Sequence, residues 1–148
     1  MTLPGPRPRL ATAYLVVAVL VIAVNLRPAL TSLGPVLDLI KDDTGLSDPA
    51  LGALGAVPIV VFAVVSPLVT ALLRRFGIEL TMVGALSVLL VGTIWRSLPG
   101  ADANLWLGTA LAGAGIAVTN VAMPALVKRD FPMMAPRVTS LYVAALSV

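Results

Sequence analysis

Two polar side chains, Asn25 and Arg27, interrupt a run of apolar residues that begins near Leu10. As one helix, residues 11–37 measure roughly 40 Å, at ~1.5 Å per residue, which is enough to cross a bilayer. Arg27 then lies at hydrocarbon depth, where an arginine costs at least ~2.5–3.5 kcal/mol and therefore faces a bundle interior or a wet cavity. Its planar guanidinium can donate two parallel hydrogen bonds to a small anion or to a carboxylate-like group.

Pro28 and Pro35 follow this arginine and break the hydrogen-bond ladder to the carbonyls of Val24 and Thr31. Inside a protein, a bend with free carbonyls can line a cavity. Two interpretations of Arg27 remain open. It either binds a ligand, or it ties its helix to the carbonyls of a neighbouring helix.

Two further residues complete the candidate substrate-binding set of Arg27, Thr31, Asn25 and Asn120. Thr31 lies one helical turn from Arg27 on the same face and can add a hydroxyl. Asn25 lies ~200° away around the helix, so we expect it to bond a neighbouring helix. Asn120 lies in a later apolar segment and is either a packing amide or a cavity residue.

The composition predicts a membrane protein. Apolar residues make up 59% of the chain and charged residues 11%, against about 45–50% and about 25% in soluble domains. The net charge of +3 comes from short clusters between apolar runs, which does not indicate nucleic-acid binding. The chain has no cysteine or histidine, and no carboxylate falls inside an expected span. We therefore expect no enzyme activity, no metal site and no cofactor.

Charged and turn-forming residues divide the chain into a cytoplasmic basic tail, residues 1–9, and a partial transmembrane bundle, residues 10–148. The expected fold is all-α, with four transmembrane helices and the start of a fifth. The expected spans are 11–37, 49–73, 80–98, 103–127 and 138–148, and the last is too short to cross a bilayer as a helix.

Glycine and proline give these elements their details. Gly45 is expected to end one helix, and Ser47 or Asp48 to cap the next. Gly77 is expected to take a left-handed conformation in the turn 74–79. Pro58 and Pro67 are expected to kink the second span without ending it. The fourth span carries small residues suited to close helix packing, namely Gly108, Ala112, Gly113, Gly115 and Ala117.

Basic residues near the segment ends predict the orientation. Seven lie on one side of the membrane and two, Lys41 and Arg96, on the other; the seven are Arg7, Arg9, Arg74, Arg75, Lys128, Arg129 and Arg137. By the positive-inside rule the N-terminus is cytoplasmic, whereas residues 38–48 and 99–102 lie outside. We expect the membrane that these helices cross to be the cell membrane.

Residues 25–35 (NLRPALTSLGP) resemble the first-helix signature of the cyanate/nitroimidazole-permease branch of the major facilitator superfamily, and residues 113–132 resemble its fourth helix and the loop that follows. The general 2–3 loop signature of the superfamily is only partly present. Leu72, Arg75 and Gly77 match it, but Arg74 replaces its aspartate, and Ile78 and Glu79 replace its basic pair.

This resemblance implies a secondary transporter that holds a small solute between two six-helix halves and alternates access. The chain would then be an N-terminal fragment of one half, and its partners would be the lipid bilayer, the solute and the missing C-terminal remainder. The alternative is a structural membrane subunit or an inactive fragment, which would not need an arginine beside two prolines in the bilayer.

The orientation can be tested by cysteine labelling in intact cells. We expect a cysteine at Asp43 to react with an impermeant thiol reagent added from outside, and a cysteine at Arg75 to be protected. The chain has no cysteine of its own, so the background is low. Labelling at residue 75 and protection at residue 43 would reverse the orientation.

Overall fold

The computed structural model describes residues 14–24, 39–42, 44–98 and 102–147, and these form helices joined by turns. The helix Tyr14–Val24 is followed by α3 (Asp48–Arg96), α4 (Asp102–Asp130) and α5 (Ala135–Ser147). The described residues form helices and no strands, which agrees with the expected all-α class.

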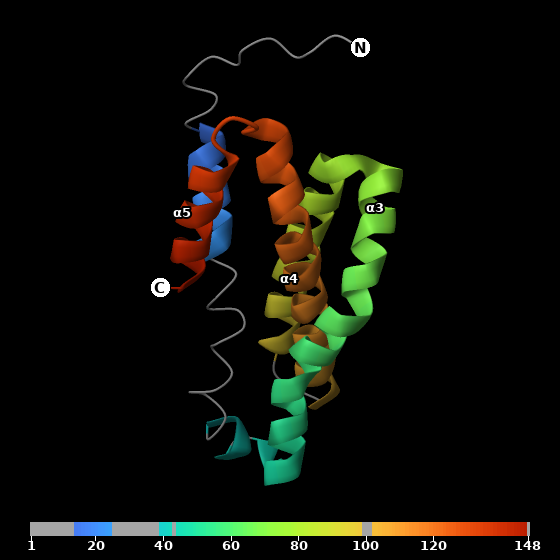
Figure 1. The fold of residues 1–148 in the computed structure, drawn as a ribbon. Helices are drawn as coiled ribbons and strands as arrows, with labels where there is room; N and C mark the ends of the chain where they lie inside the picture. The colour runs from blue at the N-terminus through green and yellow to red at the C-terminus, as the bar shows by residue number, and fades with distance from the viewer. Residues whose placement is uncertain (1–13, 25–38, 43, 99–101, 148) are drawn as a thin grey trace.

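Helix α3 consists of two arms, residues 48–76 and 78–96, that meet at Gly77 and run in opposite directions (Figure 1). Gly77 has a φ of 76° and a ψ of 168°, a backbone conformation that is open mainly to glycine. The Thr81 hydroxyl donates to the carbonyl of Gly77 at 2.6 Å and holds the turn. The positive φ predicted for Gly77 is confirmed.

The start of α3 follows the capping pattern expected from the sequence. Gly45 has a φ of 67°, and its N–H donates to the carbonyl of Lys41 at 2.9 Å, which ends the preceding helical turn. Ser47 occupies the N-cap position with an extended backbone, although its side chain makes no capping hydrogen bond. The helix then continues through Pro58 and Pro67, so neither proline ends it, as predicted.

Helix α4 packs against both arms of α3 at its glycines. A Cβ on Gly115 would lie 2.6 Å from the Ala85 carbonyl oxygen and 2.7 Å from the Leu89 nitrogen, both on the second arm. A Cβ on Gly113 would lie 3.1 Å from Cα of Pro58, on the first arm. The small residues predicted to pack this helix are all buried, so their predicted packing role is confirmed.

A second part of the core joins α4 to the remaining helices. Val19 and Ala23 of the first helix belong to the same buried apolar cluster as Ala122 of α4 and Val138 of α5. The helix Tyr14–Val24 and the C-terminal half of α4 are thus parts of one core.

The outer surface of α3 is apolar, which is unusual for a protein in water. Only 11% of its most apolar window is buried, against 56% for α4. Exposed positions include Ile59, Val64, Leu80 and Leu90. By length and composition, α3 and α4 are the two helices in the described part that could cross a membrane.

Several hydroxyl groups on the helices are satisfied locally, as an apolar environment favours, whereas the buried Thr109 hydroxyl of α4 has no partner among the described residues. Seven of them each donate to the carbonyl four residues earlier, namely Ser66, Thr81, Ser87, Thr93, Ser97, Thr119 and Ser140. These side chains need no water at the helix surface.

We expect Gly115→Ala to destabilise the protein by about 1–3 kcal/mol, because its Cβ would meet backbone atoms that cannot easily move. Gly52→Ala is the matched control, since a Cβ there meets no atom within 4 Å, and alanine favours a helix by about 0.5–1 kcal/mol over glycine. Thermal unfolding in detergent measures both. Equal midpoints for the two variants would contradict the close packing.

Candidate functional site

Three predicted substrate-binding residues, Asn25, Arg27 and Thr31, lie outside the described residues. The described helix that precedes them in the sequence is Tyr14–Val24. Its residue Ala23 is fully buried in the apolar cluster that also contains residues of the C-terminal half of α4.

The fourth predicted residue, Asn120, lies on α4 and is half-buried. Its neighbour Thr119 is buried, and the Thr119 hydroxyl donates to the carbonyl of Gly115 at 2.8 Å. The Asn120 amide has no hydrogen-bond partner among the residues that the structure describes. A half-buried amide without a partner is costly in an apolar setting, so both interpretations, a packing amide or a cavity residue, remain open.

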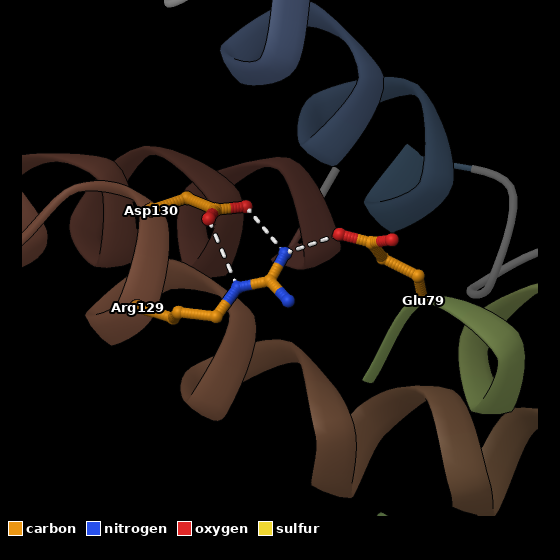
Figure 2. Close-up of polar contacts among 3 residues, drawn as sticks. All are labelled: Glu79, Arg129 and Asp130. Carbon is orange, nitrogen blue, oxygen red and sulfur yellow. Dashed lines mark hydrogen bonds and ion pairs between the residues drawn. The ribbon is translucent and has the colours of Figure 1, made fainter. Parts of the chain in front are cut away.

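The structure also contains a polar cluster that the sequence did not predict, at the end of α4 (Figure 2). Arg129 Nε and Nη2 donate to the two carboxylate oxygens of Asp130 at 3.0 and 3.2 Å, and Nη2 also donates to Glu79 Oε1 at 3.1 Å. Glu79 follows the turn between the two arms of α3. Arg129 therefore links that turn to the end of α4.

The two carboxylates of this cluster differ in environment. The Asp130 side chain is 2% exposed, whereas that of Glu79 is 82% exposed. Asp130 also lies at the C-terminus of α4, where the helix dipole disfavours a negative charge. Its paired hydrogen bonds with Arg129 offset that cost.

The hydrogen bond to Asp130 raises the pKa of Arg129 above its ordinary value, and the bond to Glu79 adds to the effect. A raised pKa stabilises the folded state wherever the group is charged, which for arginine covers all ordinary pH values. Arg129 therefore keeps its positive charge at all ordinary pH values. Among the described residues, no group of three acidic, histidine or cysteine side chains is placed to hold a metal ion.

We expect Asp130→Asn to cost about 1.5–3 kcal/mol of stability, as is typical for a hydrogen bond to a charged group. Glu79→Gln is the matched control and should cost less than about 1 kcal/mol, because that pair is exposed and screened by solvent. Thermal unfolding at low and high salt measures both. A larger loss for Glu79→Gln than for Asp130→Asn would contradict this ranking.

Comparison with known proteins identifies three transporters. The chain is 41% identical to the uncharacterized transporter YycB of Bacillus subtilis (strain 168) over 95% of the chain. It is 41% identical to the 2-nitroimidazole transporter of Escherichia coli (strain K12) over 86% of the chain, and 30% identical to the cyanate transport protein CynX of the same organism over 89%. It spans about a third of the length of each, 35%, 32% and 34%.

No protein-family model matches the chain, and no solved structure matches it. The three relatives agree with the motif in residues 25–35, which resembles the cyanate/nitroimidazole-permease branch. Along most of its length, the chain is therefore related to a group of bacterial transporters that includes the 2-nitroimidazole and cyanate transporters.

Proposed function

We propose that this chain is part of a secondary active transporter that moves a small polar or anionic solute across the cell membrane by alternating access. The observation that carries the proposal is the similarity to three named transporters over 86–95% of the chain. Because the chain spans only about a third of each relative, transport is proposed for the whole protein. The remaining segments would complete the major-facilitator fold and the substrate site.

The proposed orientation has a cytoplasmic N-terminus. Two connections assigned to the cytoplasm, residues 74–79 and 128–130, lie together in the structure because Arg129 bonds Glu79. At the other end of these helices, Trp95 Nε1 donates to Asn104 Oδ1 at 3.2 Å and joins the end of α3 to the start of α4. The two connections rich in basic residues therefore lie at the same end of the helices. This supports the orientation that the count of basic residues predicts.

Arg27 is the residue that we propose for solute recognition. Two relatives are named for cyanate and for 2-nitroimidazole, and both compounds offer electron-rich atoms that accept hydrogen bonds from a guanidinium. Thr31 would add a hydroxyl on the same helix face. Asn120 is proposed as a further polar residue near the solute, and Asn25, on another face of the first helix, as an amide that bonds a neighbouring helix at the edge of the site.

The alternative, a structural subunit that does not transport, explains packed helices and buried glycines equally well. It is less favoured because all three relatives are named as transporters. The same similarity favours a protein that is not an enzyme.

Arg27→Lys tests the recognition role in the complete gene product. Lysine keeps the charge but loses the planar fork, so we expect solute binding to weaken about tenfold or more, the equivalent of one charge-assisted hydrogen bond of about 1.5–3 kcal/mol. Arg27→Gln should bind more weakly still. Thr31→Val should lose only about 0.5–1.5 kcal/mol, the contribution of a neutral hydrogen bond.

The measurement is equilibrium binding of candidate solutes, beginning with cyanate and 2-nitroimidazole, to purified protein. A symmetric size-exclusion peak is the control for folding. Binding close to wild type in well-folded Arg27→Gln would return this arginine to the structural interpretation.

A further inference from the structure

Four exposed basic side chains gather at the end of the bundle where α3 bends, and we call them the basic surface. In chain order they are Arg74, Arg75, Lys128 and Arg137. The first two lie in the last turn of the first arm of α3, the third in the last turn of α4 and the fourth in the first turn of α5. The bond from Arg129 to Glu79 holds the bend of α3 against the end of α4. Figure 1 shows the start of α5 at the same end.

The charge of the basic surface is not compensated within the described part of the chain. None of its four cations forms an ion pair there, and the two described carboxylates at this end, Glu79 and Asp130, are both bonded to Arg129. Arg129 is therefore neutralised and is not part of the surface. The described residues at the opposite end include more acidic than basic side chains, namely Asp42, Asp48 and Asp102 against Lys41 and Arg96. An anionic partner is therefore attracted to the basic surface and not to the opposite end.

Apolar side chains lie among these cations. Phe76 is 49% exposed, and its ring centre lies 5.5 Å from the guanidinium carbon of Arg75. In the turn between α4 and α5, Met133 is 93% exposed, whereas Phe131 is buried in the core. A partner dissolved in water would match only the charge of this surface. The boundary between lipid headgroups and hydrocarbon matches both the cations and the apolar side chains.

We propose that the basic surface binds the headgroups of anionic lipids in the cytoplasmic leaflet and selects them over zwitterionic lipids. A basic residue close to an anionic membrane surface strengthens binding about fivefold, the equivalent of about 1 kcal/mol. Phosphatidylglycerol and phosphatidylethanolamine both carry a phosphate, but only phosphatidylglycerol has a net negative charge. The inference rests on the membrane location and the orientation in the proposed function, and not on transport.

The complete gene product is purified in detergent, delipidated and titrated separately with palmitoyl-oleoyl phosphatidylglycerol and palmitoyl-oleoyl phosphatidylethanolamine, and bound lipid is counted by native mass spectrometry. We expect wild type to bind the anionic lipid at least about tenfold more tightly. The same titration followed by lipid fluorescence in about 0.5 M salt should show a smaller preference, because salt screens exposed charges.

Lys128→Gln should lower this preference about fivefold. Lys41→Gln is the matched control, because it makes the same change at the opposite end of the bundle, on a lysine that is already paired with Asp48. We expect its preference to equal that of wild type. A variant with glutamine at all four positions of the basic surface should bind the two lipids equally. If that variant does not fold, the comparison of Lys128→Gln with Lys41→Gln decides the test.

Three results would overturn the proposal. One is equal binding of the two lipids by wild type. Another is an equal loss of preference in Lys128→Gln and Lys41→Gln, which would mean that the whole charge of the protein attracts the lipid. The third is an unchanged preference in the folded fourfold variant, which would place the anionic lipid elsewhere. Because the titration contains no solute, a failure of lipid selection is distinguishable from a failure of transport, which is measured by solute uptake.

Discussion

Helix α4 can lie against both arms of α3 because glycines stand where the backbones meet: a Cβ on Gly108 would lie 2.4 Å from the Arg96 nitrogen, and one on Gly115 2.6 Å from the Ala85 carbonyl oxygen. Without a hydrophobic driving force between helices in lipid, such close contacts supply much of the attraction between them. The rest of the described structure depends on this approach. It brings the end of α4 to the Gly77 turn, where Arg129 donates a hydrogen bond to Glu79. It also makes Ala114 of α4 one of the residues that line an apolar hollow between the two arms of α3.

The apolar exterior of α3 and the local bonding of its hydroxyls result from one requirement, that no polar group face hydrocarbon without a partner. Ser87 and Thr93, for example, each donate to a carbonyl four residues earlier. The charged groups gather instead at the helix ends, as in the Arg129 cluster. This division is common to proteins that span membranes, and it agrees with the transporter relatives.

Local sequence features predicted the local structure well. Gly77 lies in a short polar turn between apolar runs. Glycine is the residue that adopts the positive φ of this turn without strain. The several small residues of α4 indicated close helix packing, and its glycines meet both arms of α3. The bond between Arg129 and Glu79 could not be predicted, because it joins residues 50 positions apart and depends on how two helices meet. For Asn120, both the sequence and the structure show a polar residue within an apolar helix. Neither decides whether its amide packs against a neighbouring helix or lines a cavity.

Arg129 and Arg27 differ in their available counter-charges. Arg129 has two carboxylates, Asp130 and Glu79, as partners within this chain, so its positive charge is fully compensated. Arg27 lies in an expected span, and none of the expected spans contains a carboxylate. An unpaired cation at hydrocarbon depth is costly. Its neutralising partner must therefore come from a charge at the edge of the spans, from another segment of the protein or from an anionic solute. Only the last would make the stability of the site depend on the solute, as a recognition residue requires.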